Sequence, residues 1–219
     1  MKLIDEIDRI LPIIVKITAR KLSQSTQELS TLNWHKGESN IDVEFSELAK
    51  NKCIEAFDEI NSNKSLILSI EIPDLLLTFR REDETFLRKI ELKSTKSTDR
   101  SVPGSMIMSL DPNMWTIFCL RLKNGFEVKY GRYYLGMSRG THDLFQDRSP
   151  RPRLKFDNYQ SVDEEPNLIK KTVDESFYKH YAQTAVNRLL NPRTHSWQDN
   201  LVKEIIKIVL KKPDVFKDI

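Results

Sequence analysis

The sequence predicts a single α/β domain, residues 1 to 219, in which a central mixed β-sheet is flanked by helices. The first part carries apolar residues at helical intervals, the middle holds short apolar runs typical of strands, and the last part returns to helical spacing. This order is typical of a sheet packed between helical layers. With 39% of its 219 residues apolar, the chain is long enough to bury one sizeable core.

The N-terminal region, residues 1 to 40, is expected to be helical. Aliphatic side chains recur at helical spacing through residues 3 to 30, and Pro12 either kinks this run or splits it into two helices. A second amphipathic helix is expected from about residue 42 to residue 60. It carries several glutamates, which are Glu44, Glu47, Glu55 and Glu59.

The segment from Ile72 to Lys96 is the most informative part of the chain, because two apolar runs flank a charged turn. An antiparallel hairpin with its turn centred between Glu82 and Asp83 places Asp74 opposite Glu91. Side chains alternate between the two faces of a strand, so Lys93 projects from the same face as Glu91. The sequence therefore predicts two carboxylates and a lysine on one face of one sheet.

Two carboxylates placed this close repel each other, which calls for a shared proton or a shared cation. Oxygen ligands with open positions suit a hard ion such as Mg²⁺. A metal held there, with a lysine beside it, activates water and stabilises the charge of a phosphoryl transition state. This is the chemistry of metal-dependent phosphodiester hydrolysis.

Pro73-Asp74, a spacer and then Glu91-Leu92-Lys93 together resemble the PD-(D/E)XK nuclease superfamily, over roughly residues 44 to 136. The size and layout are most similar to a type II restriction endonuclease. The resemblance implies a restriction-endonuclease-like core over residues 41 to 136, in which Asp74 and Glu91 hold magnesium and Lys93 contacts the attacking water. It also implies a homodimer that cuts both strands of double-stranded DNA at a short palindrome.

The family often adds a third acidic residue from the helix before the Pro-Asp strand. Glu47 is the chosen candidate, because it borders the apolar stripe of its helix, where a side chain can reach a sheet edge. The alternative for any of these glutamates is a place on a solvated helix face.

Further strands are expected at residues 66 to 70, 114 to 122 and 126 to 135. Residues 94 to 112 are polar and contain Pro103 and Gly104, which predicts a loop that leaves directly from Lys93. In a DNA-cutting enzyme this loop would contact the scissile strand through Lys96 and Arg100. The alternative is an ordinary surface loop.

Residues 137 to 163 are interpreted as a basic loop. Between residues 139 and 155 the excess of positive charge equals the net charge of +3 of the whole chain, and glycine and two prolines favour an exposed loop over a helix. We hypothesise that this loop reads base edges through its arginines, although a solvated basic loop is the alternative for each of them. The arginines are Arg139, Arg148, Arg151 and Arg153.

The C-terminal region, residues 164 to 219, is expected to hold two helices, at about 164 to 190 and 197 to 211. Cys53 and Cys119 lie in apolar contexts without metal-site spacing, which indicates reduced core residues and a cytoplasmic protein. No apolar run approaches the length of a membrane span.

The sequence thus predicts a type II site-specific deoxyribonuclease with Mg²⁺ as its cofactor and DNA as its partner. Mismatch-repair nicking enzymes and junction resolvases share the same core and remain the nearest enzyme alternatives. A non-catalytic DNA-binding module, or an α/β interaction domain without a nucleic-acid role, would leave the acidic pair structural.

Overall fold

A computed structural model describes residues 2–34, 43–61, 66–96, 98, 100–104, 111, 113–137 and 153–168, and six positions between 203 and 211. The chain begins with three helices, α1 (Leu3–Gln24), α2 (Thr26–Thr31) and α3 (Val43–Ile60). Pro12 is buried inside α1 and does not split it. The expected helices of the N-terminal region are therefore confirmed. Helix α1 ends at Gln24, and the hydroxyl and backbone N–H of the next residue, Ser25, both donate to the carbonyl of Lys21.

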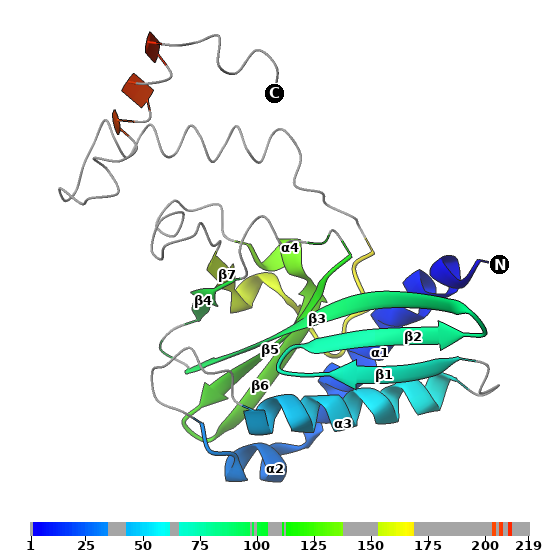
Figure 1. Ribbon diagram of the computed structural model, residues 1–219. Helices are drawn as coiled ribbons and strands as arrows, with labels where there is room; N and C mark the ends of the chain where they lie inside the picture. The colour runs from blue at the N-terminus through cyan, green and yellow to red at the C-terminus, as the bar shows by residue number, and fades with distance from the viewer. Residues whose placement is uncertain are drawn as a thin grey trace.

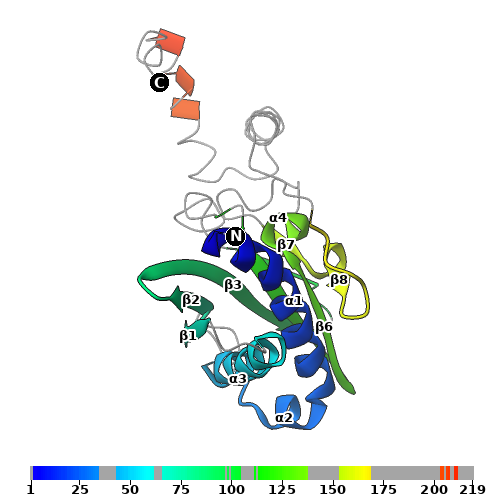
Figure 2. The ribbon, with the colours of Figure 1, turned by 90° about the vertical axis from the view of Figure 1, so that its right-hand side faces the viewer.

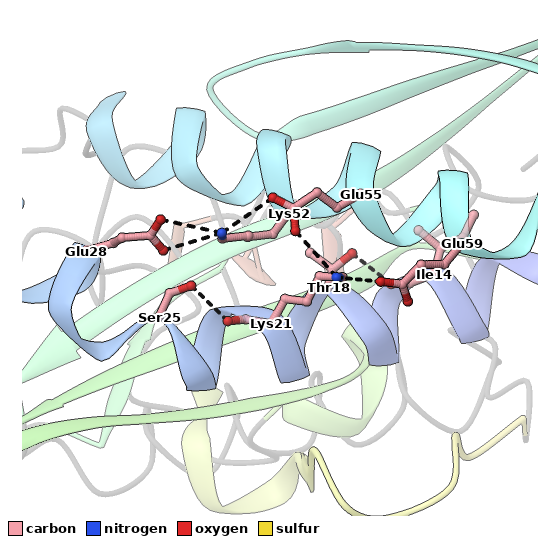
Figure 3. Close-up of polar contacts among 8 residues, drawn as sticks. All are labelled: Ile14, Thr18, Lys21, Ser25, Glu28, Lys52, Glu55 and Glu59. Atoms are coloured by element: carbon pink, nitrogen blue, oxygen red, sulfur yellow. Dashed lines mark hydrogen bonds and ion pairs between the residues drawn. The ribbon is translucent and has the colours of Figure 1, made fainter.

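Ion pairs join the three helices along their exposed edges (Figure 3). Lys21 of α1 lies 2.5 Å from Glu59 and 3.4 Å from Glu55, both on α3. Lys52 of α3 lies 3.4 Å from Glu28 of α2 and 3.4 Å from Glu55. Lys21 thus links α1 to α3, and Lys52 links α3 to α2.

The sheet has six strands in the order β1-β2-β3-β5-β6-β8 (Figures 1 and 2). Their bounds are β1 (Ile67–Glu71), β2 (Leu75–Arg81), β3 (Glu84–Lys96), β5 (Trp115–Leu122), β6 (Gly125–Arg132) and β8 (Gln160–Ser161). Strands β3 and β5 pair in parallel and the other neighbours pair antiparallel, so the sheet is mixed. The predicted α/β class, with a mixed sheet flanked by helices, is confirmed.

One face of this sheet packs against the helices. Leu75, Leu77 and Phe79 of β2 share this face with Ile90 and Leu92 of β3, and all five belong to the main buried core. Helices α1 and α3 contribute the other side of the same core, and they lie together on one side of the sheet (Figure 2). The alternation of side chains therefore sends Lys89, Glu91 and Lys93 to the opposite face.

That opposite face carries a second buried cluster over β5 and β6. It is closed by α4 (Tyr133–Gly136), the 3-10 helix η3 (Phe156–Asn158) and a small sheet of β4 (Ser101–Pro103) and β7 (Arg153–Lys155). The ring of Phe118 meets the rings of Phe156 and Tyr159 edge to face, with centroids 5.3 and 6.0 Å apart. These aromatic contacts hold the η3 segment against the central strands.

Two loop predictions are wrong in part. Strand β3 continues past Lys93 to Lys96 because Ser94, Thr95 and Lys96 pair with β5, and residues 101 to 103 form β4. The predicted basic loop, residues 137 to 163, is likewise not all loop. Arg153–Lys155 forms β7 and pairs with β4, Phe156–Asn158 forms η3, and Gln160–Ser161 forms β8. Residues 105–110 and 138–152 lie outside the described part of the chain.

The C-terminal predictions are only partly covered by the structure. Residues 164 to 168 are not helical, so the first helix does not begin where it was expected, and its remaining span lies outside the described residues. The described positions between 203 and 211 are helical, as predicted for the second helix. Among the described helices, none is both long enough and apolar enough to cross a membrane. Cys53 and Cys119 are both buried and neither forms a disulfide, as expected.

Candidate active site

The β2–β3 hairpin has the predicted register. Arg81 pairs with Glu84 across a tight turn at Glu82 and Asp83, and Leu75 pairs with Ile90 at the far end of the ladder. One residue beyond this last pair, Asp74 and Glu91 occupy opposing positions. The Oδ1 atom of Asp74 accepts the backbone N–H of Leu92 at 3.0 Å, which ties Asp74 to the partner strand.

Two lysines of β3 bind the carboxylates from the same face. The Nζ atom of Lys89 lies 2.8 Å from Oδ2 of Asp74 and 2.8 Å from Oε2 of Glu91. The Nζ atom of Lys93 lies 2.6 Å from Oε1 of Glu91. Asp74, Lys89, Glu91 and Lys93 therefore form one cluster, called here the carboxylate–lysine cluster, with no net formal charge.

Burial differs sharply within the cluster. The side chain of Glu91 is 3% exposed and that of Asp74 is 20% exposed, whereas Lys89 and Lys93 are 35% and 22% exposed. The carboxylate of Glu91 is thus at the closed end, and the lysines approach it from the side that water reaches. A buried carboxylate is tolerated in its charged form only when cations or hydrogen-bond donors accompany it.

The charges of the cluster shift the pKa values of Glu91 and Lys89. Burial alone would raise the pKa of Glu91, but the ammonium groups of Lys93 and Lys89 outweigh it and hold this pKa well below its usual value. Burial lowers the pKa of Lys89, and the carboxylates of Glu91 and Asp74 outweigh that effect and raise it. Glu91 and Lys89 are therefore both charged at neutral pH.

The neighbouring strand β5 supplies the wall beside Glu91. Thr116 is the partner of Glu91 in the parallel register and is fully buried. Burial raises the pKa of the Tyr159 phenol, the Thr116 hydroxyl opposes this rise and the negative charge of Glu91 adds to it. Phe118, the partner of Lys93 in the parallel register, belongs to the second buried cluster, which therefore borders the carboxylate–lysine cluster.

The carboxylates of this cluster suit a small divalent cation. Lys89 already places one positive charge within 2.8 Å of an oxygen of each carboxylate, so Asp74 and Glu91 converge on a common cation position. In the described part of the chain, no group of three or more His, Cys, Asp and Glu side chains could hold a metal. Two carboxylates nevertheless fit Mg²⁺, which keeps several waters and takes its remaining ligands from substrate phosphate.

The structure does not bring Glu47 into this cluster. Its helix α3 packs on the sheet face that carries Ile90 and Leu92, which is the face opposite to that of Glu91. The side chain of Glu47 is half exposed and lies 3.7 Å from Lys50, one turn further along the helix. A role for Glu47 beside the metal stays a prediction, and this geometry gives it no support.

Of the predicted DNA-contacting residues, Lys96, Arg100 and Arg153 lie in the described part of the chain. Lys96 is exposed at the end of β3, three residues beyond Lys93. Arg100 is bound to Asp157 through its Nε and Nη2 atoms and lies over the ring of Phe156, with 5.1 Å to the ring centroid. Arg153 donates to the hydroxyl and the carbonyl of Ser101, both at 2.9 Å.

These contacts give both arginines a structural task. Arg100, the residue before β4, is bound to Asp157 of η3, and Arg153 of β7 is bound to Ser101 of β4. Their role in DNA binding stays a prediction. The other predicted arginines, Arg139, Arg148 and Arg151, lie outside the described residues.

Lys89 is the member of the cluster that the sequence reasoning missed. The sequence does indicate its position. Lys89 lies two residues before Glu91 and four before Lys93, so its side chain projects from the same face of β3. In the predicted register its partner is Leu76, two residues after Asp74, so the Lys89 side chain crosses diagonally to Asp74. Diagonal neighbours of this kind lie within reach of long side chains.

A comparison with protein-family models finds no match for this chain, and a search of curated proteins finds none either. The functional conclusion therefore rests on the chemistry of the cluster. That chemistry is a pair of carboxylates able to hold a cation, with a lysine beside them able to donate hydrogen bonds to an anion or to water.

Proposed function

We propose that this chain is a type II restriction endonuclease of the PD-(D/E)XK superfamily, which hydrolyses phosphodiester bonds in double-stranded DNA with Mg²⁺. The observation that carries the proposal is the convergence of Asp74 and Glu91 on one cation position with Lys93 at 2.6 Å from Glu91. The mixed sheet with parallel neighbours β3 and β5 is compatible with a restriction-endonuclease-like core.

In this proposal each residue has a defined task. Asp74 and Glu91 hold the metal, and the hydrogen bond from Leu92 N–H orients the carboxylate of Asp74. Magnesium, when bound, would polarise the scissile phosphate and lower the pKa of a bound water. Lys93, anchored by Glu91 and partly exposed, donates hydrogen bonds to the attacking water and to the phosphate as negative charge develops.

DNA would approach from the face of the sheet on which Lys89 and Lys93 are partly exposed. Lys96 would contact the backbone next to the scissile phosphate. We also propose a homodimer, because a two-fold protein matches a palindromic DNA site and places one cluster on each strand.

The pairing of the lysines favours a second candidate, a DNA-binding module without catalysis. Lys89 and Lys93 already neutralise both carboxylates, so the charges of the cluster are balanced without a metal ion. In that case the cluster stabilises the β2–β3 hairpin and has no chemical role.

The Lys93→Ala variant separates these candidates. For a nuclease, the variant keeps its affinity for DNA and loses Mg²⁺-dependent cleavage by about 100-fold or more, as expected for loss of a group that acts on the reacting atoms. Lys50→Ala, a lysine on the opposite side of the sheet, is the matched control and should cleave like the parent. Equal DNA binding by Lys93→Ala and the parent, with no cleavage by either, would favour the binding module.

A further inference from the structure

The ammonium of Lys89 lies in the position that a shared metal ion would need. It is 2.8 Å from an oxygen of Asp74 and 2.8 Å from an oxygen of Glu91, and these are the two groups assigned to the metal. An ammonium and a divalent cation cannot both lie between the same two oxygens, since like charges this close repel strongly.

Lys89 is also the cluster member best able to leave. Its side chain is 35% exposed, and a lysine has a flexible stem that carries its charge into water. Glu91, by contrast, is 3% exposed and needs a cation beside it at all times. If Lys89 withdraws, its charge is hydrated, while the buried carboxylate accepts a new cation in its place.

We propose that Lys89 is an intramolecular competitor of the divalent cation: its ammonium holds the cation position in the metal-free protein and withdraws toward solvent when a metal binds. This inference rests on the proposed function in one respect: the proposed function assigns Asp74 and Glu91 to a metal. Lys89 is then a positioning residue. It keeps the two carboxylates together without metal, and it sets the metal concentration at which the site fills.

Lys93 does not have the same position. Its ammonium contacts Oε1 of Glu91, whereas Lys89 contacts Oε2 and also reaches Asp74. Removing Lys89 therefore opens the place between the carboxylates, while Lys93 remains to contact water or phosphate. The two lysines, four residues apart on one strand, have separate tasks.

The test is the affinity of the full-length protein for Mn²⁺, measured without DNA by electron paramagnetic resonance of the free ion. Lys89→Met should bind Mn²⁺ about tenfold more tightly than the parent or better, because it removes both the competing charge and its steric occupancy. Lys89→Arg keeps the charge and should stay near the parent affinity. Lys96→Met, which removes one exposed charge from the same strand, should change the affinity by no more than about twofold.

Two further measurements tie the effect to the cluster. Adding Glu91→Gln to Lys89→Met should abolish the gain in affinity. Mn²⁺ should also raise the unfolding temperature of Lys89→Met by more than that of the parent, because tighter binding to the folded state stabilises it more. If Lys89→Met does not fold, Lys89→Gln, which keeps a hydrogen-bonding group, serves in the same measurements.

The inference is overturned if Lys89→Met binds Mn²⁺ no more tightly than the parent, if Lys96→Met gains as much, or if neither the parent nor Lys89→Met binds Mn²⁺. These outcomes are independent of cleavage. A parent that cuts DNA with Mg²⁺, together with an unchanged Lys89→Met affinity, refutes only the competition. A tight-binding Lys89→Met, with a parent that cuts no DNA, refutes only the nuclease.

Discussion

The Glu91→Gln substitution tests the energetics of the carboxylate–lysine cluster in the metal-free protein. It keeps the shape of a side chain that is 3% exposed, and it removes the charge that two ammonium groups contact at 2.6 and 2.8 Å. Removing one partner of a buried pair typically costs about 3 to 5 kcal/mol. Here the orphaned lysines are partly exposed and can be hydrated, so we expect a loss of about 2 to 3 kcal/mol in the free energy of unfolding.

Urea unfolding followed by circular dichroism measures this loss directly. Glu84→Gln is the matched control, because Glu84 is exposed at the start of the same strand and should change the free energy of unfolding by less than about 0.5 kcal/mol. A Glu91→Gln protein as stable as the Glu84→Gln protein would refute the reasoning, because the lysines would then contribute nothing to burial of the carboxylate.

The pH dependence of this difference follows from the lowered pKa of Glu91. The folded state holds the carboxylate in its charged form more strongly than the unfolded state does. The stability that it contributes is therefore fully present above its unfolded pKa, about 4.3 for glutamate, and is lost as the pH falls through the lower folded value. The difference in the free energy of unfolding between the parent and Glu91→Gln should be constant near neutral pH and shrink below about pH 4.

Two other contacts give further predictions. Gly136→Ala would place a Cβ atom 2.0 Å from the hydroxyl oxygen of buried Tyr159. It should therefore lower the free energy of unfolding, measured in urea, by about 1 to 3 kcal/mol. Adding Tyr159→Leu should recover part of that loss. An additive double variant would contradict this contact. Arg88→Met removes the Nε and Nη2 hydrogen bonds to Asp8 at 3.1 and 2.8 Å, which join β3 to α1, and should lower the unfolding free energy by about 1 to 2 kcal/mol. An unchanged denaturation midpoint would show that this pair contributes nothing.

The local features of the fold were predictable because their signals lie close together in the sequence. The charged turn at Glu82 and Asp83 fixes the hairpin register, since a tight antiparallel turn determines every pair that follows it. The placement of Asp74 opposite Glu91, and of Lys93 on the same face, follows from that register alone. Helix α3 was likewise evident from its apolar period.

The nonlocal features were not predictable by the same means. Strands β4 and β7 are three residues long and join Ser101 to Arg153, which are 52 residues apart, so neither strand shows a period of its own. The side of the sheet on which α3 packs decides whether Glu47 can approach Glu91, and helix periodicity does not specify that side. Lys89 reaches Asp74 by a diagonal contact, which the pairing of directly opposite residues does not reveal.

The most direct test of the proposed function is incubation of the purified protein with unmethylated plasmid and phage DNA, with and without Mg²⁺. The account predicts discrete fragments that require Mg²⁺ and vanish in Lys93→Ala, and the mapped ends would define a short recognition site. A smear or isolated nicks would favour a repair or structure-specific nuclease. Intact DNA under all conditions, bound equally by the parent and the variant, would contradict the catalytic assignment of Asp74, Glu91 and Lys93.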